Sequence, residues 1–379
     1  MRVERIILNL AATALLVVAA ASCKKPEHPT EDQKPTEEQV DPGTDPGTDP
    51  GTDPGTDPGT DPGTDPGTDP GTDPGTDPGT DPGTERVISI PKPVTASDGS
   101  TLRILAIGNS FSQDAVEQYL YELFKASGQE TVIGNMYIGG CTIDTHLGKA
   151  NNGARDYEYR KVVNGTKTNT AGKGLLEGIK DEKWDVISVQ QASGSSGIYS
   201  TYSNLNALID YVKANATNPD AVIVFHQTWA YSTNSTHAEF PKYDSNQITM
   251  YSMICDAADQ MFRDCVSVAG IIPSGTAIQN ARTSYLGDSF NRDGYHLEVN
   301  YGRFTAACTW VEALTGKDVT TNPYKPSTVS DSQAKVAKAA AHAACRKVLE
   351  VTELTDFKTP PTSDDLSLPS VEEKDMGTI

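Results

Sequence analysis

The sequence has 379 residues and a formal net charge of −20. Residues 41–84 are eleven consecutive copies of Asp-Pro-Gly-Thr, which supply no hydrophobic core, and without their aspartates the net charge is −9. This acidity argues against a nucleic-acid partner, because phosphate binding needs a basic face. About 290 residues follow the repeats, which is enough for one domain with a well-buried core.

The N-terminal segment has the pattern of an export signal. Arg2 and Arg5 precede an apolar run from Ile6 to Ala21, too short for a typical membrane span. The run ends in Ala20-Ala21-Ser22-Cys23, which resembles a bacterial lipobox, although Ala20 stands where leucine is usual. An ordinary cleaved signal is the alternative. We expect a protein that is exported and anchored to the bacterial cell envelope, at the outer membrane or cell surface, through a lipid on Cys23 alone.

Composition divides the chain into four parts. We predict a signal peptide and lipobox at residues 1–23, a disordered linker at 24–84, a folded domain at 85–355 and a disordered acidic tail at 356–379. In the linker, a proline at every fourth residue of the repeats prevents helix formation and strand pairing. The linker is therefore expected to hold the domain away from the membrane.

Apolar runs and helical periods alternate through the domain. Strands are predicted at 102–107, 131–138, 184–189, 221–225 and 266–272, and helical periods cover 115–124, 205–214, 248–262 and 303–314. Ser112 is expected to cap the first helix. Alternating strands and helices predict an α/β fold with a mainly parallel sheet covered on both faces. In such sheets the ligand lies at the carboxyl ends of the strands.

A hairpin is predicted between the second and third of these strands. The segment Tyr157–Val163 is followed by Asn164-Gly165, a pair typical of a type I′ turn, and then by Thr166 to Thr168. Two interpretations stay open. The hairpin is either a flap over the site that contributes Arg160 or Lys161, or a solvated surface hairpin.

Chemically useful side chains gather at the predicted strand ends. Ser110 follows the first strand, and Asp293 lies three residues before His296 near the last helix. A serine hydroxyl needs a base and a carboxylate that orients the base, so these three residues form a candidate catalytic triad. No cofactor or metal is needed for such chemistry.

The same strand ends offer donors for an oxyanion. These are the backbone N–H groups of Ser110 and Gly140 and a side-chain amide from Gln190 or Gln191. His226 and Trp229, at and after the fourth strand, either contact substrate or pack in the core.

This set of motifs resembles the SGNH or GDSL hydrolase superfamily, in particular a branch of exported bacterial lipoproteins. Its blocks match Gly108-Asn109-Ser110-Phe111-Ser112, Gly139-Gly140-Cys141, Gln190-Gln191 and Asp293-Gly294-Tyr295-His296, in this order. The resemblance implies a flavodoxin-like three-layer α/β/α sandwich and esterase or acylhydrolase activity. Two departures stand out: Asn109 replaces the usual aspartate, and the glutamine pair replaces the oxyanion asparagine of Gly-x-Asn-Asp.

The leading hypothesis is a serine esterase that removes an acyl group from an extracellular ester through an acyl-enzyme. An acylated carbohydrate, whether a small molecule or a polysaccharide, is the expected substrate class. The alternative is a catalytically inactive, glycan-binding surface lipoprotein on the same scaffold. The sequence makes no prediction of the oligomeric state.

Overall fold

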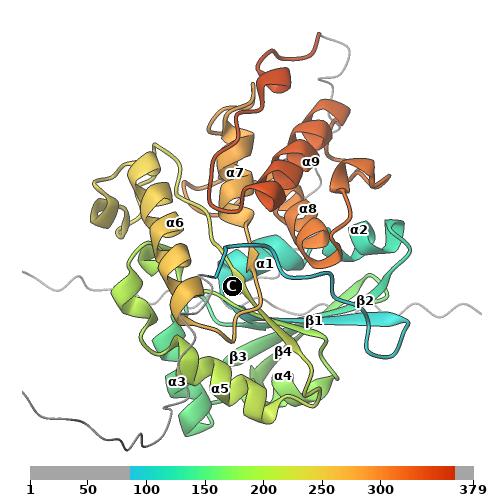
Figure 1. The fold of residues 1–379 in the computed structure, drawn as a ribbon, viewed down its shortest axis with the longest axis vertical. Coiled ribbons are helices and arrows are strands. Elements are labelled where there is room, and N and C mark those ends of the chain that lie inside the picture. The colour runs from blue at the N-terminus through green and yellow to red at the C-terminus, as the bar shows by residue number, and fades with distance from the viewer. Residues whose placement is uncertain (1–85, 363–379) are drawn as a thin grey trace, which may run out of the picture. The chain divides into compact units, whose positions relative to one another are not determined.

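The computed structural model describes residues 86–362 (Figure 1). The predicted signal peptide, the lipidation site Cys23 and the repeat linker lie outside the described residues, as do residues 363–379 of the predicted tail. Within the described part, no helix is long and apolar enough to cross a membrane. The proposed boundaries of the four parts therefore stay predictions.

A seven-stranded sheet forms the centre of the domain, in the order β4-β3-β2-β1-β5-β6-β7. The strands are β1 (Thr101–Gly108), β2 (Glu130–Tyr137), β3 (Tyr157–Val163), β4 (Thr166–Lys173), β5 (Val186–Val189), β6 (Val222–His226) and β7 (Ile271–Ile272). Strands β2, β1, β5, β6 and β7 run parallel to one another. Numbered among themselves in chain order they read 2-1-3-4-5, which is the flavodoxin-like order. The predicted mainly parallel α/β fold is confirmed.

Helices cover both faces of this sheet. They are α1 (Ser110–Val116), α2 (Leu120–Ala126), α3 (Ile143–Asn152), α4 (Leu175–Asp181), α5 (Leu205–Asn215), α6 (Gln247–Asp264), α7 (Ser274–Arg282), α8 (Tyr301–Thr315) and α9 (Asp331–Arg346). Figure 1 shows α1, α2, α7, α8 and α9 on one side of the sheet and α3, α4 and α5 on the other. Each side has its own hydrophobic core, and α6 contributes to both. The domain is thus a three-layer α/β/α sandwich.

The first predicted helix differs from the structure in two ways. The helical period at 115–124 is divided into α1 and α2, which are separated by Glu117, Gln118 and Tyr119. The cap of α1 is Asn109, whose side chain accepts a hydrogen bond from the Phe111 N–H, and not Ser112. Ser112 is buried, and its hydroxyl has two acceptors for its single proton, the Asn109 carbonyl at 2.8 Å and Asn135 Oδ1 at 2.9 Å. A hydroxyl committed to these acceptors is not the cap of the helix start.

The last predicted strand is much shorter than its apolar run. Only Ile271 and Ile272 pair with β6, whereas Val266 is 78% exposed. A short apolar run does not indicate at which residue hydrogen bonding to the neighbouring strand begins. The backbone at Gly270 instead lies against Ile90 and Pro91, because a Cβ at Gly270 would come within 2.1 Å of Pro91 N.

The β3–β4 hairpin extends the sheet beyond β2. Its turn has positive φ at both Asn164 (52°) and Gly165 (75°), as a type I′ turn requires. Strand β3 pairs antiparallel with β2 over six residues and buries Tyr157 and Tyr159, while β4 is exposed along nearly its whole length. The hairpin is therefore part of the sheet and not a flap.

Candidate active site

Ser110 lies at the point where the strand order reverses. Its strand β1 is flanked by β2 and β5, so the chain leaves the sheet at the edge where such folds bind ligands. The side chain of Asn109 caps α1, and Ser110 is the first residue of that helix. Ser110 is partly exposed, and neither its hydroxyl nor its N–H has a hydrogen-bond partner among residues 86–362. Both groups are available to a substrate.

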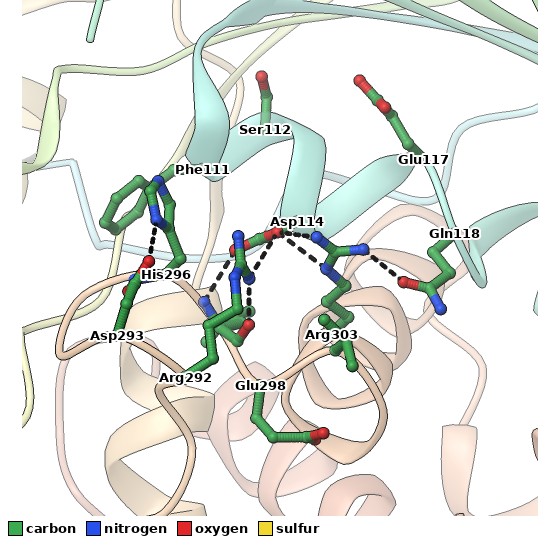
Figure 2. A network of polar contacts seen from close by, with 12 residues as sticks. Phe111, Ser112, Asp114, Glu117, Gln118, Arg292, Asp293, His296, Glu298 and Arg303 are labelled. Atoms are coloured by element: carbon green, nitrogen blue, oxygen red, sulfur yellow. Dashed lines mark hydrogen bonds and ion pairs between the residues drawn. The ribbon is translucent and has the colours of Figure 1, made fainter. Parts of the chain in front are cut away.

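Asp293 and His296 form a directly bonded pair. Asp293 Oδ2 lies 2.6 Å from His296 Nδ1, and Asp293 Oδ1 accepts the His296 N–H at 2.8 Å (Figure 2). An ionised carboxylate only accepts hydrogen bonds, so Nδ1 carries the proton. Nε2 then keeps its lone pair, and it has no partner in the described part of the chain. This is the tautomer that a general base needs.

The electrostatics of Asp293 favour the ionised form. Burial alone would raise the pKa of its carboxyl, but hydrogen bonds from the His296 ring and from the backbone N–H groups of His296 and Tyr295 outweigh it. The net effect is a pKa below the usual value. The two side chains remain accessible, at 17% for His296 and 40% for Asp293.

A tight loop holds this pair beside the nucleophile helix. Asn291 and Leu297 form an isolated antiparallel bridge across the loop, and the Arg292 N–H donates to the His296 carbonyl. The His296 ring lies 6.0 Å from the ring of Phe111, the residue after Ser110. The loop thus places His296 close to the first turn of α1, the helix that Ser110 begins.

A glycine turn follows the neighbouring strand β2. The Cys141 N–H donates to the Ile138 carbonyl and closes the turn, with Gly140 at φ 63°. Gly140 is exposed, a Cβ there would meet nothing within 4 Å, and its N–H has no acceptor among the described residues. This N–H is free to meet an oxyanion.

The two glutamines have different environments. Gln190 Nε2 donates to Asn109 Oδ1 at 2.9 Å, and its second N–H has no partner among residues 86–362. Gln190 Oε1 is 2.9 Å from His226 Nδ1. Gln191 Nε2 is committed to the carbonyl and hydroxyl of Thr201, and its Oε1 accepts from the Ile143 N–H. Of the two, only Gln190 shares a hydrogen bond with the segment that carries Ser110.

His226 and Trp229, the two residues predicted either to contact substrate or to pack in the core, are both fully buried and pack in the core. His226 is fully buried between Gln190 and Ser274, and burial lowers its pKa to about 3. A neutral His226 therefore donates from Nδ1 to the Gln190 oxygen and fixes the orientation of that amide. Trp229 is fully buried and stacks on Phe111 at 4.3 Å, and its Nε1 donates to the Tyr295 carbonyl. His226 therefore positions Gln190, and Trp229 packs against Phe111 and bonds to Tyr295.

Two residues near Asp293 and His296 were not predicted from the sequence. His237, in the irregular chain after β6, has its ring 4.6 Å from Tyr295, which itself lies 4.1 Å from the His296 ring. Burial lowers the pKa of His237, and the nearby His296 adds to this effect. Asp114, one turn after Ser110, is buried among two arginines. A charged residue on a buried helix face was the available signal for Asp114, whereas none marked His237.

One group of side chains in the described chain has the composition of a metal site. Glu312, Asp318 and His342 place their ligand atoms within 4.8 Å of one another. His342 Nδ1 already pairs with Glu312 Oε1 at 2.8 Å and with Asp318 at 3.3 Å. These residues belong to the last turn of α8, the following segment and α9, and none of them contacts the triad. The five described cysteines are all buried and free.

The comparisons place the chain in a family. Residues 103–344 match the model of a domain of unknown function, DUF4886. A crystal structure of a DUF4886 family protein from Bacteroides uniformis is 52% identical, covers 68% of this chain and 100% of its own, and superimposes with a TM-score of 0.67. The acetylxylan esterase Axe2 from Geobacillus stearothermophilus is 13% identical over 57% of this chain and 94% of its own, with a TM-score of 0.38. No curated protein matched the sequence.

Proposed function

This chain belongs to the DUF4886 family, and from the geometry of its site we propose that it is a serine ester hydrolase of the SGNH type that works through an acyl-enzyme. One observation carries the proposal. The bonded Asp293–His296 pair presents an unpartnered Nε2 beside the helix that begins at Ser110. Serine, histidine and aspartate in this relation are recognised by geometry and role, whatever the order in the chain.

The mechanism follows from the free groups of the site. Ser110 Oγ attacks the acyl carbon while His296 Nε2 takes its proton, and Asp293 stabilises the imidazolium that forms. The Ser110 N–H, the Gly140 N–H and the second N–H of Gln190 are proposed to hold the oxyanion. When the tetrahedral intermediate collapses, the ester bond breaks and His296 gives the proton to the leaving alcohol. A water molecule then hydrolyses the acyl-enzyme by the same steps.

We propose an acylated carbohydrate as the substrate class. The partly exposed rings of Tyr295 and His237 lie directly beside His296, where the alcohol part of the ester would leave. Aromatic rings with a polar edge suit a sugar, which has both apolar faces and hydroxyl groups. The export signal and the lipid on Cys23 remain part of the proposal, since a surface-anchored enzyme would meet extracellular polysaccharide.

The first test is hydrolysis of p-nitrophenyl acetate and butyrate by the purified protein. We expect turnover by the wild type and a loss of about 10³-fold or more in kcat for both Ser110→Ala and His296→Ala. A substitution of Gly140 would not remove its backbone N–H, so the oxyanion donors are tested with Gln190→Ala. This variant should lose roughly 10²-fold or more in kcat.

Ser203→Ala is the matched control, because Ser203 is exposed and lies outside the site. It should retain wild-type kcat. Equal trace rates for the wild type, Ser110→Ala and His296→Ala would contradict the esterase proposal. Glycan binding that Ser110→Ala leaves unchanged would then favour the inactive, glycan-binding alternative.

A further inference from the structure

Asp114 is the most heavily bonded carboxylate around the site. Its side chain has no exposed surface. Arg303 on α8 contacts it through Nε at 2.8 Å and Nη2 at 2.7 Å, and Arg292 contacts both of its oxygens at 3.2 and 3.0 Å. The Leu297 N–H donates to Asp114 Oδ2 at 2.8 Å. Figure 2 shows the carboxylate between the two guanidinium groups.

The partners of Asp114 bracket the catalytic pair. Arg292 directly precedes Asp293, and Leu297 directly follows His296. Arg292 also donates to the Leu297 carbonyl, so the two ends of the loop are joined to each other and to the same carboxylate. Asp114 therefore bonds to the residue before Asp293 and to the residue after His296, and to none of the residues from 293 to 296.

Asp114 is also fixed relative to the nucleophile. It lies four residues after Ser110 in α1, which corresponds to about 6 Å along a helix axis. Ser110 and Asp114 thus belong to one rigid turn of helix. The separation of Ser110 from His296 depends on how firmly the loop is held at Asp114.

We propose that Asp114 is a positioning residue that locks the His296 loop onto the nucleophile helix and so sets the distance between base and nucleophile. This inference rests on the proposed function for its catalytic meaning, but the lock itself is a property of the folded chain. Misplacement of a reacting group by about 1 Å can cost roughly 10²-fold in rate. Loss of the lock should then lower kcat and leave KM nearly unchanged, because no substrate contact is removed.

The test compares Asp114→Asn with Asp185→Asn in the full chain. Asp185 is an equally buried carboxylate that accepts the backbone N–H groups of Ser97 and Arg103 at the opposite end of the sheet. Amide hydrogen exchange of residues 291–300 should become at least about tenfold faster in Asp114→Asn and stay unchanged in Asp185→Asn. The kcat for p-nitrophenyl acetate and the rate of Ser110 labelling by a fluorophosphonate should fall by about 10²-fold only in Asp114→Asn.

Arg292→Gln provides a milder variant if Asp114→Asn does not fold, since the Arg292 side chain is 31% exposed. It should move exchange and kcat in the same direction. If Asp114→Asn does fold, the effect of Arg292→Gln should not add to that of Asp114→Asn in the double variant. Unchanged exchange at 291–300 in a folded Asp114→Asn protein would overturn the lock. So would a loss of kcat in Asp185→Asn equal to that in Asp114→Asn. A wild type that neither turns over nor reacts with the fluorophosphonate would defeat the proposed function, and hydrogen exchange would still decide the lock.

Discussion

Asn109 joins three separate segments of the candidate site through one side chain. Its Oδ1 accepts from the Phe111 N–H and from Gln190 Nε2, and its Nδ2 donates to the Cys141 carbonyl at 3.1 Å. These contacts link the start of α1, the end of β5 and the glycine turn after β2. An aspartate could accept the first two bonds but could not donate the third. The asparagine at a position where the resemblance leads one to expect aspartate is therefore explained by the Cys141 carbonyl.

Asn109→Asp should make catalysis depend on pH in a new way. In this variant the carboxylate oxygen that replaces Nδ2 would face the Cys141 carbonyl oxygen, and burial together with this repulsion raises the pKa of the carboxyl. Protonation at lower pH restores a donor to the carbonyl. We therefore expect kcat/KM of Asn109→Asp, divided by that of the wild type, to be lowest near pH 8 and to rise steadily toward pH 5. The measurement is a pH–rate profile of both proteins on p-nitrophenyl acetate.

The ratio removes any pH dependence that the variant shares with the wild type. Asn151→Asp serves as control, because Asn151 is exposed on α3 and the substitution makes the same chemical change away from the site. Its ratio should be flat. A flat ratio for Asn109→Asp as well would mean that the donation to Cys141 does not matter for catalysis.

At the scale of elements, the sequence was informative where an apolar run ends in a polar turn. The strand that precedes Ser110 and the one that precedes Gly140 were predicted to within one residue at each end, and the strand order then brings Ser110 and Gly140 to one edge of the sheet. Asp293 and His296 could be paired because a spacing of three in a turn permits the contact. Strand pairing beyond an apolar run, as at β7, depends on neighbours that the sequence does not specify.

The sequence was least informative about polar residues that follow a strand. His226 and Trp229 have the residue types of a sugar site, yet both point into the core, where Gln190, Ser274 and the Tyr295 carbonyl satisfy them. A local pattern cannot reveal partners that lie tens of residues away. The same limit applies to Asp114, whose partners Arg292 and Arg303 lie 178 and 189 residues later in the sequence.

The β3–β4 hairpin offers an element-scale prediction, because it was a candidate flap. Gly165→Ala places a side chain at φ 75° and within 3.0 Å of the Tyr121 ring. The free energy of unfolding should fall by roughly 1 kcal/mol or more. Since the hairpin only extends the sheet, kcat and KM per folded molecule should stay at wild-type values. Urea unfolding and ester hydrolysis measure the two effects.

Gly148→Ala is the companion variant for the hairpin experiment. Gly148 lies within α3, its φ is not positive and a Cβ there would meet nothing within 4 Å. Stability should be unchanged or slightly higher, since alanine is the better helix former. A rise of KM in Gly165→Ala alone would revive the flap interpretation.

At the scale of the whole molecule, two fully buried histidines make stability sensitive to acid. Burial lowers the pKa of both His146 and His226 to about 3, whereas a histidine in the unfolded chain titrates near 6.5. Between these values the unfolded state binds more protons than the folded state. The stability of the fold is therefore complete above about pH 6.5 and declines as the pH falls toward 3.

This decline can be measured by urea unfolding at pH 7 and pH 5. Each buried histidine should lower the free energy of unfolding by roughly 2 kcal/mol over that interval. His146 Nδ1 bonds only to the Tyr157 hydroxyl, so His146→Gln keeps a polar partner while removing the titration. The variant should lose roughly 2 kcal/mol less than the wild type between the two pH values. An identical loss in both proteins would show that His146 is not buried in its neutral form.

The lock between Asp114 and Leu297 joins residues 183 positions apart in the chain. Contacts of such long range form late, because the chain between them must be ordered first. A chain that is still being synthesised would thus carry Ser110 without His296 for about half of the elongation. The proposed hydrolytic activity would begin only when nearly the whole domain has been completed and folded, so the protein would be latent during its own production.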